Sequence, residues 1–351
     1  MITIFIPKNY SDLYNLFEFL WPEKKPITSE NKIKLSVCEQ SEDFQSAKNI
    51  LDKVVGPLYY RVNKNELDLK PQIFNSPIRI LMNPKEQIVY NAIKNNILDF
   101  SSKDYLNNFE VVNSLRKGRM IRMRQCLSYT KLLRNAIEGY EEDLVNNSEL
   151  GEIITNYDDY ELPAKLEKLI LIVKEFQIRN EKVVIWAHFI ETIKLIEKQF
   201  KLNGFKCKKI IGETPSERST VSEEETREKI RNEFVSCDSG LDILLANPAA
   251  CAESISLHKT CYNAIYYDLS YNGAQYLQSL DRIHRVGGSE EQESYYHFLH
   301  YENTIEPDIL SNLESKKHKM LNIIETNYNI CSLDMFEEND DLELYETLFT
   351  E

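Results

Sequence analysis

Three side chains in the segment QYLQSLDRIHRVGG are spaced so that they could act together. Gln278, Arg282 and Arg285 lie four and three residues apart, which places them on one face of a predicted helix. Two arginines on one face can stabilise the negative charge that develops when a phosphoryl group is transferred. Alternatively, Asp281 pairs with Arg285 on a solvated helix face. The spacing alone leaves both interpretations open.

From Lys182 onward, on both sides of this segment, short apolar strands alternate with helices. Helices are predicted at 190–200 and, with a serine cap, at 222–234. This alternation predicts a parallel sheet covered by helices. Because ligands of open α/β sheets gather at the carboxyl ends of the strands, the arginines are well placed for a ligand. The candidate strands are 183–187, 206–211, 242–246, 263–268 and 294–299.

Four regions are predicted along the chain. Residues 1–137 carry long helical patterns with few strand signals, residues 138–162 form a polar linker, residues 163–301 form the α/β domain, and residues 302–351 form a closing helix with an acidic tail. Pro163 is suited to begin the helix that leads into the α/β domain. The predicted fold class is therefore α/β, with a mainly helical region before the sheet.

Composition limits the class of protein. The seven cysteines are scattered without a CxxC pair, which predicts neither disulfides nor a zinc site and favours a reducing cytoplasm. No apolar run approaches the roughly 20 residues that cross a bilayer, so we expect no membrane contact. The formal charge of −14 argues against a surface that is wrapped by nucleic acid. Any contact with nucleic acid must be local.

The usual nucleotide-binding loops are missing from the printed sequence. It contains neither G-x-x-x-x-G-K-[ST] nor G-x-G-x-x-G, and it has only ten glycines. We therefore expect that these residues do not hydrolyse ATP alone. The six histidines show no H-E-x-x-H or comparable spacing, so no metal site is predicted.

Several other residues have two interpretations. The segment RKGRMIRMR, residues 116–124, is the most basic, and a local basic run is the expected footprint of nucleic-acid binding. The lysines of KCKKII, residues 206–211, could contact DNA, although alternating lysines are more typical of an exposed sheet edge. His284 is expected to be a packed or capping residue rather than a general base. Trp21 and Trp186 are expected in the core.

QYLQSLDRIHRVGG also resembles the last signature motif of the Swi/Snf-type superfamily 2 helicase-like ATPases, which runs Q, then D-R-x-H-R-x-G-Q. Further segments resemble this family in the correct order. Within the α/β domain they are VVIWAHF, IIGETPSERS with TREKIRNEF, and LLANPAACAESISLHKTCYNAIYYD. Outside it they are KNYSDLYNLFEFLWP, LYYRVNK, MIRMRQCLS and TIEPDILSNLESKKHKML. The resemblance covers nearly the whole chain.

The resemblance implies a RecA-like fold and the C-terminal half of a motor. The family's first lobe carries the P-loop and binds ATP and Mg²⁺, while the second lobe presents arginines to the γ-phosphate. Arg282 and Arg285 are then the arginine-finger candidates. The implied nucleotide-side residues are Gln278, Asp281, Ser254 and Glu253. The implied nucleic-acid contacts are His188 and Phe189, with Arg119 and Arg122 from the basic segment.

The implied function is the second lobe of an ATP-dependent double-stranded DNA translocase, which contacts DNA without reading its sequence. A P-loop-bearing first lobe, in cis or in trans, would be its partner, and without it the chain is expected to be inactive. The alternative is a non-catalytic DNA- or protein-binding module that keeps the fold of a motor lobe. A truncated reading frame is also consistent with the sequence.

The chain departs from the family pattern at a few positions. Cys251, Ala252 and Ser254 replace the usual glycines, and Gly288 replaces the final glutamine of the last motif. Together with S-I-S-L-H, these changes resemble a bacterial or viral branch. They weaken the assignment of nucleotide contacts outside the arginines.

Overall fold

A computed structural model describes residues 10–41, 43–55, 67–101, 109–134, 148–216, 225–251 and 255–325. The chain divides into two compact units. One contains the described residues up to Asp68 together with those from Ser311 onward, and the other contains those between Leu69 and Leu310. The second unit carries every candidate site residue that the structure describes.

The first unit begins with three helices, which are α1 (Tyr10–Leu20), α2 (Ser29–Gln40) and α3 (Phe44–Val54). Thr28 and Asp43 precede α2 and α3, and their side-chain oxygens accept N–H groups of the first helical turn, as N-caps do. Trp21 is only partly buried but packs against the apolar core between these helices. The fully buried members of that core include Tyr10, Leu35 and Leu51.

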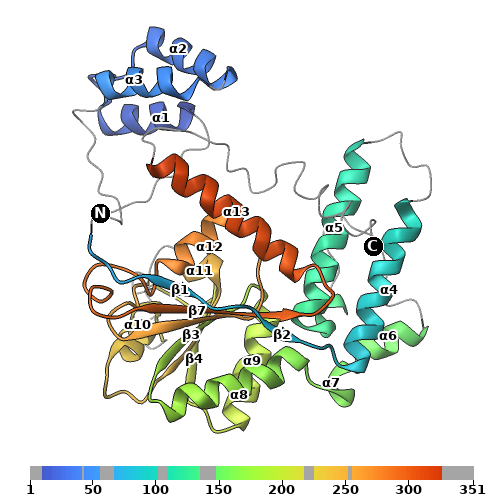
Figure 1. Cartoon of the computed structure of the whole chain (residues 1–351). Coiled ribbons are helices and arrows are strands. Elements are labelled where there is room, and N and C mark those ends of the chain that lie inside the picture. The colour runs from blue at the N-terminus through green and yellow to red at the C-terminus, as the bar shows by residue number, and fades with distance from the viewer. Residues whose placement is uncertain are drawn as a thin grey trace. The chain divides into compact units, whose positions relative to one another are not determined.

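The second unit is built on a parallel sheet. Its strands are β1 (Gln72–Phe74), β2 (Ile78–Ile80), β3 (Lys182–Trp186), β4 (Cys207–Ile210), β5 (Ile243–Ala246), β6 (Cys261–Tyr266) and β7 (Ser294–Tyr301). Their order across the sheet is β1-β7-β6-β3-β5-β4, and β2 also pairs with β7 (Figure 1). All five predicted strands form, which confirms the RecA-like α/β fold.

The central strands of the sheet are buried on both faces, which explains why they appear in the sequence as continuous apolar runs. Every residue of β3 and β5 is buried, as expected for strands that are covered on both faces. Trp186 has 0% of its surface exposed, which confirms its place in the core. By contrast, β4 lies at the edge of the sheet, and its two central residues, Lys208 and Lys209, are only half-buried.

Helices cover both faces of this sheet. In Figure 1, α8 and α9 lie on one face, and α11 and α12 lie on the other. The helix predicted at 222–234 begins later, because Thr226 caps α10 by accepting the N–H of Lys229, and residues 217–224 lie outside the described residues. The bounds are α8 (Ala164–Ile178), α9 (Ile190–Leu202), α10 (Arg227–Val235), α11 (Pro248–Cys251), α12 (Gly273–Leu280) and, after β7, α13 (Glu306–Glu325).

Two short strands from the region expected to be helical complete the sheet. β1 pairs with β7 from Gln72 opposite Ser294, and β2 pairs with the end of β7 from Ile78 opposite Leu299. These strands could not be predicted from the sequence, because three residues are too few to show a period. Residues from Leu69 onward therefore belong to the α/β unit.

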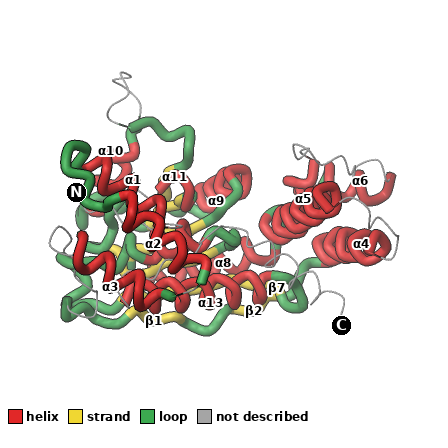
Figure 2. Tube along the Cα trace, turned by 90° about the horizontal axis from the view of Figure 1, so that it is seen from above, coloured by secondary structure: helices red, strands yellow, loops and turns green. Residues whose placement is uncertain are grey.

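The remaining helices form a group beside the sheet. They are α4 (Pro84–Ser101), α5 (Phe109–Ser128), the 3-10 helix η3 (Thr130–Arg134), α6 (Ser148–Thr155) and α7 (Tyr157–Tyr160). Figures 1 and 2 both show α4 and α5 side by side.

The polar stretch predicted as a linker, residues 138–162, is helical in its described part. Its acidic side chains hold the neighbouring helices. Glu161 accepts the N–H groups of Lys85 and Glu86, both at 3.0 Å, at the start of α4, where the helix dipole favours a negative charge. Asp158 accepts the Tyr129 hydroxyl at 2.6 Å. The high polarity of this stretch therefore serves packing between helices.

Candidate functional site

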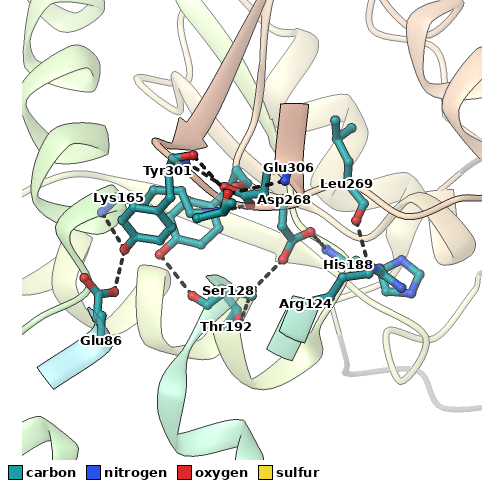
Figure 3. A network of polar contacts seen from close by, with 12 residues as sticks. Glu86, Arg124, Ser128, Lys165, His188, Thr192, Asp268, Leu269, Tyr301 and Glu306 are labelled. Atoms are coloured by element: carbon teal, nitrogen blue, oxygen red, sulfur yellow. Dashed lines mark hydrogen bonds and ion pairs between the residues drawn. The ribbon is translucent and has the colours of Figure 1, made fainter. Parts of the chain in front are cut away.

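Polar side chains meet at the carboxyl ends of β3 and β6, where an open α/β sheet binds its ligands. Asp268 follows β6, and its Oδ1 accepts the backbone N–H of His188, which follows β3, over 2.6 Å. Its Oδ2 accepts the hydroxyl of Ser128 at the end of α5, also over 2.6 Å. Ser128 lies 2.8 Å from Thr192 of α9. One carboxylate thus joins two loops of the sheet to α5 and α9 (Figure 3).

Arg124 of α5 reaches the same edge of the sheet. Its Nε donates to the Leu269 carbonyl over 3.0 Å. Its guanidinium carbon lies 5.4 Å from the ring centre of Phe189 and 5.9 Å from that of Tyr271, within the range of cation–π contact. Figure 3 shows the arginine beside His188. The arginine is half-buried between the loops that follow β3 and β6.

The positive charge at this edge of the sheet is carried by Arg124 and not by His188. Burial and, to a smaller extent, the neighbouring Arg124 lower the pKa of His188 to about 4, although Asp268 opposes both effects. The imidazole is therefore neutral at pH values near 7. His188 was predicted as a nucleic-acid contact, and in its neutral form it can offer only hydrogen bonds.

A second buried cluster continues the network toward α4 and α13 (Figure 3). Lys165 of α8 has a fully buried side chain and pairs with Glu306 over 2.5 Å. Glu306 also accepts the N–H of Tyr301 over 2.8 Å, and the Tyr301 hydroxyl donates to Glu86 over 2.5 Å. Burial raises the pKa of Glu306, although Lys165 opposes the shift. These contacts fix α8, α13 and α4 to the end of β7.

The predicted arginine helix is shorter than expected. α12 ends at Leu280, so Gln278, Arg282 and Arg285 do not share a helix face. Beyond the helix, the Arg282 carbonyl accepts the N–H of Leu257 over 2.9 Å. Gln278 remains half-buried on α12, and Asp281 is the residue that ends it.

The two arginines are nevertheless brought together, on the segment that precedes β6. Arg282 is 5% exposed, and its Nη1 donates to the Ile255 carbonyl over 3.1 Å while its Nε donates to the Gln278 carbonyl over 3.1 Å. Arg285 is half-buried, and its Nη1 donates to the Ser256 hydroxyl over 2.8 Å. The arginines therefore meet through tertiary contacts.

Two more arginines hold the same part of the chain. Arg231 donates to the Ser256 carbonyl over 3.2 Å, and Arg227 donates to the Ala250 carbonyl over 3.1 Å. Arginine contacts thus lie on both sides of residues 252–254. Glu253 and Ser254, which were predicted as nucleotide contacts, lie outside the described residues.

The departure at Gly288 has a steric reason. A Cβ built at this position would lie 2.1 Å from the carbonyl oxygen of His258, so a glutamine there would clash with the backbone. Glu290 accepts the N–H groups of Gly287 and Gly288 over 2.6 and 2.8 Å. The turn after Arg285 therefore packs directly against the segment that holds the arginines.

Arg119 and Arg122 do not lie where a nucleic acid could reach them. Each is 4% exposed, and Arg122 donates to the Leu133 carbonyl over 3.2 Å. The basic segment was predicted from its local charge, but the helix turns these two side chains into the fold. Arg124, in the same segment, was not singled out, although its spacing from the other arginines could have shown that it faces a different direction.

The other basic candidates are involved in packing or pairing. Lys208 pairs with Glu225 and Glu233, Lys209 pairs with Glu197, and Lys206 lies 3.4 Å from Glu233. The preferred interpretation, an exposed sheet edge, is confirmed by the position of β4. The His284 Nε2 lies 2.8 Å from the Lys70 carbonyl, and the side chain is buried, in agreement with a packed residue.

Among the described residues, no group of three or more histidine, cysteine or acidic side chains is arranged to hold a metal ion. In the same part of the chain, no helix combines the length and apolar character that crossing a membrane requires.

Comparison with known proteins adds a family match. Residues 163–287 match the helicase conserved C-terminal domain. "Protein CHROMATIN REMODELING 5" of Arabidopsis thaliana is 24% identical over 324 residues, which are 90% of this chain and 17% of that protein. The mouse "SWI/SNF-related matrix-associated actin-dependent regulator of chromatin subfamily A member 1" is 23% identical over 331 residues, 89% of this chain and 27% of that protein. The chain thus spans only a minor part of the length of these relatives.

The fold also matches a solved structure. The crystal structure of the C-terminal part of the Fun30 ATPase domain aligns with a TM-score of 0.53 and 17% identity, covering 80% of this chain and 97% of that one. Residues 163–287 thus match the helicase conserved C-terminal domain, in a chain that is similar in sequence to Swi/Snf-type proteins and in fold to the C-terminal part of the Fun30 ATPase domain.

Proposed function

We propose that this chain is the second lobe of an ATP-dependent double-stranded DNA translocase. ATP and Mg²⁺ would be held mainly by a P-loop-bearing first lobe, on the same or on a separate polypeptide. The observation that carries the proposal is the convergence of Arg282 and Arg285 on residues 255–256, inside the match to the helicase C-terminal domain. The lobe is proposed to span residues 163–301.

The two arginines would have different roles at the nucleotide. Arg282 uses its Nε and Nη1 on main-chain carbonyls and is buried, so it would anchor the segment. Arg285 is more accessible and is held through a hydroxyl, which a phosphate oxygen could replace as the acceptor. Arg285 would therefore be the residue that stabilises the charge of the transferred phosphoryl group. Gln278, Asp281, Glu253 and Ser254 would line the nucleotide side.

DNA would run past the loop that follows β3. His188 and Phe189 would contact the sugar–phosphate backbone, because such contacts position a strand without reading its sequence. The S-I-S-L-H pattern supports a bacterial or viral branch, and a reducing cytoplasm is proposed as the compartment.

An ATPase assay tests the proposal. The chain is mixed with a Walker-bearing first lobe and double-stranded DNA, and turnover is compared for the wild type, Arg282→Ala and Arg285→Ala. We expect turnover to fall about 10³-fold or more for Arg285→Ala, as when an arginine finger is removed. Arg179→Ala, which removes an exposed arginine that pairs with Glu181, is the matched control.

Turnover that survives both arginine substitutions would disprove the catalytic role. If the wild type binds DNA but supports no turnover with any first lobe, the result favours a non-catalytic module with the fold of a motor lobe.

A further inference from the structure

We propose that Arg124 binds a backbone phosphate of double-stranded DNA beside the loop that follows β3. This inference rests on the proposed function, because it adds a contact to the DNA side of the lobe. None of the residues predicted for that side supplies a positive charge there, since Arg119 and Arg122 are buried elsewhere in the fold. Arg124 of α5 reaches this edge of the sheet.

The surroundings hold the guanidinium in one orientation. The Leu269 carbonyl takes the Nε–H group over 3.0 Å. The rings of Phe189 and Tyr271 lie 5.4 and 5.9 Å from the guanidinium carbon. A planar guanidinium fixed in this way has lost its rotational freedom before any ligand arrives. Because the guanidinium is planar and fixed, the directions of its remaining N–H groups are fixed as well.

Part of the hydrogen-bonding capacity of Arg124 is unused. Its Nη2 atom has no hydrogen-bond acceptor in the part of the chain that the structure describes. No described carboxylate forms an ion pair with it, although the nearby Asp268, whose oxygens accept from His188 and Ser128, favours the charged form of the arginine. A buried donor without an acceptor is costly. Nη2 itself is buried, but the arginine as a whole is only half-buried, so a phosphate oxygen could approach the guanidinium and supply the opposite charge.

The hydrogen bonds of Asp268 fix the position of α5, and with it Arg124, relative to the loop that follows β3. Ser128, one helical turn after Arg124, donates to Asp268, and Asp268 accepts the N–H of His188. The end of α5 and the loop after β3 are therefore fixed to the same carboxylate. Charge from α5 and backbone contacts from residues 188–189 would act on neighbouring atoms of one strand of DNA.

The test is the salt dependence of DNA binding. The 351-residue chain is titrated with a short fluorescent duplex at several KCl concentrations, and the slope of log K against log[KCl] is compared among variants. Arg124→Gln is expected to lower the slope by about one, because one phosphate contact is lost. Arg124→Lys keeps the charge and should keep the slope. Arg179→Gln removes an exposed arginine elsewhere and should leave affinity and slope unchanged.

The outcomes separate the two proposals. If folded Arg124→Gln keeps the wild-type slope, the phosphate contact is disproved while the proposed function stands. If the wild type does not bind the duplex at low salt, the DNA part of the proposed function fails, and this inference fails with it. Thermal unfolding checks each variant. If Arg124→Gln does not fold, Arg124→Met takes its place, because its apolar stem can pack between the two rings without a charge.

Discussion

Asp268 and His188 are joined by a hydrogen bond of 2.6 Å from the His188 backbone N–H to the Asp268 carboxylate. The bond connects the loops after β3 and β6, which are neighbouring strands of the sheet. It also makes the loop after β3 depend on Asp268, a residue to which the sequence alone assigned no role. Sequence position alone would assign Asp268 only to the end of a strand.

Asp268→Asn is expected to weaken the contacts that join the loop after β3 and the end of α5 to the loop after β6. An amide offers one acceptor oxygen to the two donors that the carboxylate now accepts, and its NH₂ group faces the other donor. The free energy of unfolding should fall by ~1–3 kcal/mol, and amide hydrogen exchange at His188 should accelerate. Asp158→Asn, which also loses a carboxylate between two donors but at a more exposed site, is the control. Equal losses for the two variants would contradict the role given to Asp268.

The buried pair of Lys165 and Glu306 provides a second prediction. Lys165→Met leaves the Glu306 carboxylate buried without its cation, which should cost about 3–5 kcal/mol in urea unfolding. The double variant Lys165→Met with Glu306→Gln should recover part of this loss, because no uncompensated charge remains. Lys194→Met breaks an exposed pair with Glu191 and should cost about 1 kcal/mol or less. Failure of the double variant to recover any stability would exclude charge burial as the cause.

His300 should make the fold sensitive to mild acid. Burial and, to a smaller extent, the charge of Lys165 lower its pKa to about 4, whereas the unfolded imidazole takes up its proton near pH 6.5. The unfolded state therefore binds more protons between these values, so the contribution of His300 to stability is complete above about pH 6.5 and is lost as the pH falls toward about 4.

Replacing the histidine isolates this effect from the buried acids, whose raised pKa values act in the opposite direction. Between about pH 7 and about pH 5, the stability of His300→Gln relative to the wild type should improve by about 2 kcal/mol. Chemical denaturation at the two pH values measures the difference. A constant difference would mean that His300 titrates normally in the folded protein.

Gly288 is predicted to be intolerant of a side chain. Gly288→Ala places a methyl group against the His258 carbonyl, and the forced shift should cost ~1–3 kcal/mol. Gly212→Ala meets no atom within 4 Å and should change stability by about 0.5 kcal/mol or less. Thermal unfolding compares the two, and equal midpoints would show that the 255–260 segment moves freely away from the turn.

Much of the sheet was predictable because its central strands are continuous apolar runs between turn signals. The position of the arginines after β6 was also predictable, but their helical arrangement was wrong. The Arg282 carbonyl accepts the Leu257 N–H, and such a tertiary contact leaves no mark on local spacing. Arg119 and Arg122 illustrate the same limit, because local charge does not show which way a helix faces.

Contacts between residues far apart in sequence were the least predictable. Arg124 is fixed by Leu269, Phe189 and Tyr271, which lie far from it in sequence. Ser256 becomes notable only once two arginines are seen to converge on it. No periodicity could have paired these positions, since their contacts arise when the strands bring distant loops to one edge of the sheet.

The pairing of β1 and β2 with β7 sets the order in which this unit can be completed. Gln72 donates to the Tyr296 hydroxyl across 224 positions of chain, so β1 waits without a partner strand while the intervening residues are synthesised. Closing so long a loop is slow, and an unpaired strand is a site for misassociation during that delay. A ribosome that releases its product before β7 emerges would therefore leave an open sheet edge for chaperones or aggregation.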